Sequence, residues 1–175
     1  MNSFLGSGLQ SPIKRRVFVS YHHGGDQYYY DAFSKVFHDG YEAIYDNSLE
    51  RRINSDDSVY VMRQIREKYI TGTSCTIVLV GSLTDQRKYV DWEIKATLEK
   101  SHGLIGVRLP SARVEGGKTI VPARLHDNIQ SGYAVWTSWE ELMANQLVLQ
   151  RLIENANSRS KTLIVNSREL KTRNG

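Results

Sequence analysis

The feature that most constrains the fold of this chain is a run of six residues, Cys75 to Val80 (CTIVLV), of which five are apolar. A short, continuous apolar run is typical of a strand that is buried on both faces, as in the middle of a parallel sheet. Gly81 and Ser82 interrupt the run, and the polar residues 84–86 predict a turn. The sequence therefore predicts a sheet with helices on both of its faces.

A helix is predicted to begin near Lys88, directly after this turn. Its apolar positions follow the spacing of a core-facing stripe, namely Val90, Ile94, Thr97 and Leu98. At about 100° per residue, Glu93 lies roughly 100° from the centre of that stripe, so its carboxylate is expected at the stripe's edge, partly dry. Spacing alone favours the alternative, an ordinary glutamate on the helix surface.

Strands and helices alternate along the rest of the chain. Strands are predicted at 17–21, 41–45, 75–80, 104–107 and 133–136, and helices follow Asp26, residues 54–57, Lys88 and Ser138, with Asp26 and Ser138 as caps. This alternation predicts an α/β, flavodoxin-like three-layer fold with a central, mostly parallel five-stranded sheet. Residues 115–119 are interpreted as a turn, because the first glycine of a phosphate-binding loop would fall on Ala112 and no helix follows.

The charge distribution separates the ends of the chain from its body. The basic residues at 14–16 and the tail 158–175 hold a net +7, whereas residues 17–157 carry 15 basic and 18 acidic side chains. The sequence thus predicts a flexible leader (1–14), one domain (15–157) and a basic C-terminal tail (158–175) whose last nine residues can be removed without loss of the fold. A body without a basic groove argues against nucleic acid as a partner.

Cysteine usage and hydropathy bear on the compartment. The chain has one cysteine, Cys75, which fits a reducing environment, and a buried thiol is the favoured interpretation of its position in the strand run. No apolar run approaches the ~20 residues of a membrane span, and no signal-peptide pattern is found. A cytoplasmic protein without a membrane partner is expected.

Candidate site residues lie at the ends of the predicted strands, because ligands of open α/β sheets bind beyond the carboxyl ends of the strands. They are Ser20, Tyr21, His22 and His23 after the first strand, Asp46 and Asn47 after the second, and Gly81, Ser82 and Thr84 after the third. A phosphoacceptor site would need carboxylates where this chain has two histidines and a Gly-Ser pair. Two adjacent histidines rarely chelate one ion, so no metal site is predicted. No nucleophile elbow is present.

Three motifs together resemble the TIR-like domain of bacterial Thoeris anti-phage proteins: VFVSY at 17–21, TIVLVGS at 76–82 and YVDWEI at 89–94. The resemblance covers residues 15–110 well and the remainder loosely. It implies an enzyme that cleaves NAD at the nicotinamide–ribose bond, as an NAD⁺ glycohydrolase or ADP-ribosyl cyclase, with Glu93 as the catalytic residue. Many relatives carry Trp four residues before this Glu, where this chain has Tyr89; Trp92 lies directly beside it.

The chemistry suits this implication, because loss of nicotinamide leaves an oxocarbenium-like ribose that one carboxylate can orient and stabilise. Tyr21 and Trp92 could stack on a ring of NAD, and Ser20, Ser82 and Asn47 could donate hydrogen bonds. The alternatives are core packing for the two aromatic residues and turn chemistry for the serines. NAD would be the substrate, and no cofactor is expected.

Three functions remain open from the sequence. The favoured one is an NAD-consuming defence enzyme that makes a cyclic or conjugated ADP-ribose signal, with a phage-derived trigger and a downstream effector that senses the product. The others are a non-enzymatic TIR scaffold that acts by self-association and a nucleotide sensor without turnover. The resemblance also implies a homo-oligomer when active, with Arg51 or Arg52 of the charged segment 46–56 as candidate contacts between copies.

Overall fold

The structure is a computed structural model of the 175-residue chain and describes residues 15–38, 44–45 and 55–175. Its centre is a five-stranded, all-parallel sheet in the order β2-β1-β3-β4-β7. The strands are β1 (Val17–Ser20), β2 (Ile44–Tyr45), β3 (Cys75–Val80), β4 (Gly103–Arg108) and β7 (Val135–Ser138). This order is that of flavodoxin-like folds, and it confirms the predicted fold class.

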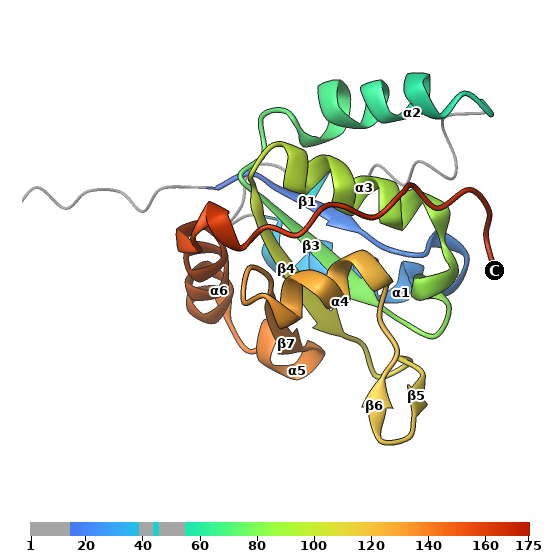
Figure 1. Ribbon diagram of the computed structural model, residues 1–175. Helices are drawn as coiled ribbons and strands as arrows, with labels where there is room; N and C mark the ends of the chain where they lie inside the picture. Colours follow the sequence, from blue (N-terminus) through green and yellow to red (C-terminus); the bar gives the residue numbers. More distant parts are fainter. Residues whose placement is uncertain (1–14, 39–43, 46–54) are drawn as a thin grey trace, which may run out of the picture.

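Helices cover both faces of the sheet (Figure 1). One face packs against α1 (His23–Phe37), α5 (Trp139–Leu142) and α6 (Gln146–Ser158). The other packs against α2 (Ser58–Gln64), its π-helical continuation Ile65–Ile70, α3 (Lys88–Glu99) and α4 (Ala123–Gln130). The remaining elements are the 3₁₀ turns Thr84–Gln86 and Lys161–Leu163 and a small hairpin of β5 (Val114–Glu115) and β6 (Lys118–Thr119). Within the described residues, no helix is both long and apolar enough to cross a membrane.

Strand β3 explains why the sheet needs two layers of helices. All six of its residues are buried, as its apolar run predicts. Cys75, Ile77 and Leu79 belong to the core under α1 and α6, whereas Val78 and Val80 belong to the core under α3 and α4. Because side chains alternate across a strand, a strand that is apolar at nearly every position must be covered on both sides.

Several predicted details are wrong. Asp26 does not cap α1: the cap position is His22, and Asp26 lies buried in the first helical turn. Helix α4 was not predicted at all. Ser138 does cap a helix, but only the four-residue α5, and α6 has its own cap in Asn145.

The turn at 115–119 is confirmed as the bend of the β5–β6 hairpin, where Gly116 and Gly117 have positive φ.

The C-terminal segment lies along α3 (Figure 1, dark red). We call residues 164–175 the strap. Its path is fixed at one end by Asn128 of α4, which donates to the Val165 carbonyl and accepts from the Val165 amide. At the other end Asn174 accepts from the Lys88 amide, and the Gly175 amide donates to the Gln86 carbonyl. The strap thus runs from α4 to the N-terminal end of α3.

Candidate active site

Glu93 lies on the inner face of α3, against the end of β1. Its side chain is only 3% exposed, so it is fully buried rather than at the edge of the stripe as predicted. The Ser20 hydroxyl, at the carboxyl end of β1, donates to the Glu93 carboxylate. Ser20 and Glu93, two of the predicted site residues, are therefore in direct contact.

Two threonines fix the height of α3 above the sheet. The Thr97 hydroxyl donates to the Glu93 carbonyl one turn away, at 2.8 Å, and lies 2.7 Å from the Thr76 hydroxyl of β3. All three residues are buried. The register of Glu93 against Ser20 thus depends on a polar contact inside an otherwise apolar interface, where a hydrogen bond has a well-defined geometry.

The contact between Ser20 and Glu93 lies where α/β sheets of this order bind ligands. The chain leaves β1 toward β2 on one side and later places β3 on the other, so β1 and β3 flank the point at which the strand order reverses. The segments after these two strands begin with Tyr21 and Gly81. Asp46 and Asn47, predicted as site residues after β2, lie outside the described residues.

The loop after β1 is built around stacked aromatic rings. Tyr21 is buried and stacks on Tyr30 of α1, with ring centroids 4.8 Å apart and planes 7° apart. Its hydroxyl donates to Gln27 Oε1 at 3.0 Å and lies 3.2 Å from His23 Nδ1. His22 is also buried, at the start of α1. The structure thus places Tyr21 in the packing role that was its alternative interpretation.

The two predicted aromatic residues of α3 pack in or against the apolar cluster beneath α2. Trp92 is 4% exposed and belongs to the apolar cluster that includes Phe18, Met62 and Ile65, and its indole N–H donates to the Lys171 carbonyl of the strap at 2.8 Å. The Tyr89 ring meets that of Trp92 edge-on at 5.6 Å. These contacts hold Trp92 in the core beneath α2, so it supports α3 rather than sharing the face of Glu93.

A buried carboxylate that the sequence reasoning treated only as a cap lies at the same edge of the sheet. Asp26 is 2% exposed and accepts from the Ser111 hydroxyl after β4, at 3.3 Å, and from the Thr84 hydroxyl after β3, at 3.4 Å. Thr84 in turn accepts from the Gly81 amide at 2.8 Å, and Ser82 beside it is exposed. Asp26 therefore joins the segments that follow β1, β3 and β4.

The environment of Asp26 also shifts its titration. Burial raises the pKa of this carboxyl group, while hydrogen bonds from Ser111 and Thr84 and the charge of His22 act in the opposite direction. Gly81 is required beside it, because a Cβ atom at position 81 would lie 2.2 Å from Asp26 Oδ1. The sequence gives no specific signal for the contact between Asp26 and Gly81, beyond the presence of a glycine at the end of β3.

The described part of the chain contains no group of three or more His, Cys, Asp or Glu side chains placed to hold a metal ion. A cavity of about 310 Å³ lies between the strap and the start of α4, lined by Asp85, Asp91, Pro122, Ala123, Arg168, Glu169 and Lys171. Its lining includes neither Glu93 nor Ser20, and Asp91, Asp85 and Arg168 are each engaged in ion pairs there.

Comparison with known protein families gives one assignment. The family model for the Thoeris protein ThsB, TIR-like domain, matches residues 18–114, from the first residues of β1 to the beginning of β5. That range is more than half of the chain, and it contains Ser20, Asp26, Gly81 and Glu93. A search of curated proteins gave no match. With its parallel sheet, its strand order and this match, the chain belongs to the TIR-like domain family of the Thoeris anti-phage defence protein ThsB.

Proposed function

We propose that this protein is a NAD-consuming enzyme of Thoeris defence and that Glu93 is its catalytic residue. The observation that carries the proposal is the buried carboxylate of Glu93, held by Ser20 at the reversal point of the strand order. A carboxylate in a dry site interacts strongly with positive charge, because few water dipoles screen it. Such a group is suited to a reaction in which cationic character develops on the substrate.

In the proposed reaction the bond between ribose C1′ and the nicotinamide nitrogen breaks, and both electrons of the bond stay with nicotinamide. The nicotinamide leaves as a neutral molecule, and C1′ becomes oxocarbenium-like. Glu93 orients the ribose through its hydroxyl groups and stabilises the developing charge. Water or a hydroxyl group of a nucleoside then adds to C1′ and releases a proton, which gives ADP-ribose, a cyclic isomer or a conjugate.

The other residues of the site have supporting parts in this proposal. Ser20 holds the Glu93 carboxylate toward the end of β1, and a ribose hydroxyl would join or replace it as donor. His22 and the exposed Ser82 lie at the ends of the two central strands, where they could contact the pyrophosphate or the second ribose. Asp46 and Asn47 stay predicted binding residues. The proposed partners are a phage-derived trigger, an effector that senses the product, and further copies of the chain.

The test compares two isosteric changes on one helix. Glu93→Gln removes the proposed catalytic charge, whereas Glu99→Gln removes a partly exposed carboxylate that pairs with Arg66 and Lys95. Purified proteins are incubated with NAD in extract from phage-infected cells, which supplies the trigger, and free nicotinamide is quantified. We expect Glu93→Gln to lower the rate by about 100-fold or more, and Glu99→Gln to leave it within about threefold of wild type.

Two outcomes contradict the proposal in different ways. Equal rates for wild type and Glu93→Gln would show that Glu93 is not catalytic. No nicotinamide from wild type or Glu99→Gln, with or without infected extract, would favour the scaffold that acts by self-association. Circular dichroism of each variant confirms that the comparison is made between folded proteins.

A further inference from the structure

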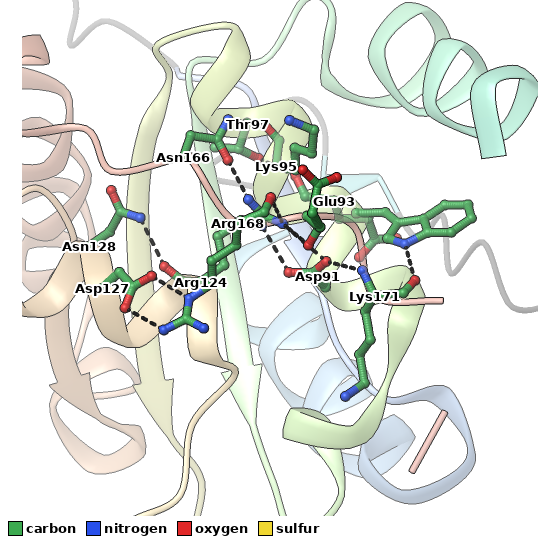
Figure 2. A network of polar contacts seen from close by, with 12 residues as sticks. Asp91, Glu93, Lys95, Thr97, Arg124, Asp127, Asn128, Asn166, Arg168 and Lys171 are labelled. Atoms are coloured by element: carbon green, nitrogen blue, oxygen red, sulfur yellow. Dashed lines mark hydrogen bonds and ion pairs between the residues drawn. The ribbon is translucent and has the colours of Figure 1, made fainter. Parts of the chain in front are cut away.

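A network of polar contacts joins the strap to α3 and α4 (Figure 2). Its centre is Arg124 of α4, whose side chain is completely buried. The guanidinium donates to Asp91 through Nε at 2.8 Å and through Nη2 at 3.3 Å. A buried, two-point ion pair of this kind fixes distance and orientation together.

The same guanidinium also binds the strap. Nη1 donates to the Asn166 side chain at 2.8 Å, and Nη2 donates to the carbonyls of Arg168 and Glu169 at 2.9 and 3.0 Å. All three side-chain nitrogens of Arg124 therefore donate hydrogen bonds, and two of its hydrogen bonds to the strap are accepted by main-chain carbonyls. Loss of the strap would leave a buried cation with Asp91 as its sole remaining partner among these contacts.

The strap in turn binds the residues that immediately precede Glu93. The Lys171 amide donates to Asp91 at 3.0 Å, and the Lys171 carbonyl accepts from Trp92 at 2.8 Å. Leu170 packs on the apolar cluster that contains Trp92. One residue of the strap thus clamps two consecutive residues of α3, and Glu93 is the next residue along the helix.

The position of Asp91 on the helix explains how this clamp can affect the orientation of Glu93. Asp91 and Glu93 are two residues apart, which corresponds to about 200° around the helix axis. Asp91 is therefore held on one side by Arg124 and the strap, while Glu93 and Thr97 are held on another side by Ser20 and Thr76. Helix α3 is fixed between two sets of polar contacts on opposite sides.

We propose that Arg124 and the strap are a positioning device for Glu93, which acts through Asp91 and Trp92. The printed contacts of Arg124 and the strap on α3 are made to Asp91 and Trp92, and these contacts set the rotation and height of the helix. The catalytic part of this inference rests on the proposed NAD-cleaving function. The clamp on α3 itself does not, and it can be measured separately.

The first experiment measures the clamp without any substrate. Hydrogen–deuterium exchange is followed in wild type and in Arg124→Lys, which keeps the charge but cannot contact Asp91 and the strap carbonyls at once. We expect faster exchange in peptides that cover 164–171 and α3, by about tenfold or more, with β3 unchanged. Arg168→Gln is the matched control, because the Arg168 side chain pairs with Asp127, and the contact of this residue with Arg124 is made by its main-chain carbonyl, which the substitution keeps.

The second experiment measures the consequence for turnover. Arg124→Lys is expected to lower kcat by about tenfold to a hundredfold with little change in KM, since a small displacement of a catalytic group slows the chemical step without removing a substrate contact. Arg168→Gln is expected to stay within about twofold of wild type. If Arg124→Lys does not fold, Asn166→Ala takes its place, because it removes the strap side chain that accepts from Arg124 and donates to the Lys95 carbonyl of α3, and it leaves the Asp91 pair intact.

The outcomes separate the two proposals. Faster exchange in the strap with unchanged exchange in α3 and unchanged kcat would overturn the inference and leave the strap a passive cover. If wild type releases no nicotinamide under any condition, the proposed function fails, and α3 exchange alone decides whether the clamp exists. Equal effects of Arg124→Lys and Arg168→Gln would show that any change in the strap matters, rather than the clamp at Asp91.

Discussion

Gly81→Ala should destabilise the protein through one contact, that with Asp26. An ideal Cβ at position 81 would lie 2.2 Å from Asp26 Oδ1, 2.4 Å from Oδ2 and 2.5 Å from Cγ. Since a Cβ contact below 3.0 Å is essentially never found, the carboxylate must move by about 1 Å. Such a movement strains the packed site and weakens the hydrogen bonds from Ser111 and Thr84, so we expect a loss of about 2–4 kcal/mol.

A second background makes this prediction specific. The three atoms nearest to the added methyl group all belong to the Asp26 carboxyl group, so Asp26→Ala should provide the space that Gly81→Ala needs. In that background we expect Gly81→Ala to change stability by no more than about 1 kcal/mol, with a stabilising contribution from the less flexible unfolded chain. The coupling energy between the two sites should therefore be about 2 kcal/mol or more.

The assay is urea unfolding of the four proteins of this double-mutant cycle, followed by fluorescence at fixed pH. Equal m-values would show that the unfolded states are comparable, and the midpoints then give the four stabilities. If Gly81→Ala costs the same in both backgrounds, the contact with Asp26 is not the cause of the loss. That result would refute the steric account of why a glycine follows β3.

Two further predictions follow from the structure. Burial raises the pKa of Asp26 in the folded state, so the folded protein binds this proton more tightly than the unfolded chain does. The stability of the wild type should therefore fall as the pH rises from the ordinary pKa of a carboxyl group through the raised pKa of Asp26. Asp26→Asn should lack this slope, so its stability relative to wild type should increase between about pH 4 and pH 7, as measured by urea midpoints; parallel profiles would contradict the assignment. Deletion of residues 167–175 should lower Tm by about 5–10 °C, because Arg124 loses its hydrogen bonds to two main-chain carbonyls, and Trp92 and Asp91 lose theirs to the main chain of Lys171. Deletion of 172–175 should have a smaller effect. An unchanged Tm after the longer deletion would support the sequence-based prediction that the tail is dispensable.

The central strands and α3 could be predicted because their own residues determine them. The apolar run at 75–80 is typical of a strand covered on both faces, and the helix from Lys88 carries its own periodic stripe. The helix start predicted at 54–57 is confirmed for the same local reason, since the Asp57 side chain accepts from the amides of Val59 and Tyr60. In these elements, residues that are close in sequence supply the information.

The parts that failed depend on residues distant in the chain. Helix α4 has a weak local signal, but its Arg124 and Asn128 are fixed by residues 37 to 45 positions later. The full burial of Glu93 could not be predicted from its helical spacing, because the carboxylate meets its partner Ser20, 73 residues earlier, only in the folded sheet. Asp26 has the signature of a helix cap in the sequence, and its actual partners Thr84 and Ser111 become neighbours only when the sheet forms.

The single cysteine has a practical consequence. Cys75 is fully buried at the start of β3, and burial raises the pKa of its thiol, so the thiolate that reacts with maleimide dyes is scarce at neutral pH. The native protein therefore provides a silent background for site-specific labelling. A cysteine introduced at the exposed Arg173 would carry a fluorophore on the strap alone, without the need to replace Cys75 in the core. Movement of the strap could then be followed optically, in real time and in a cell extract.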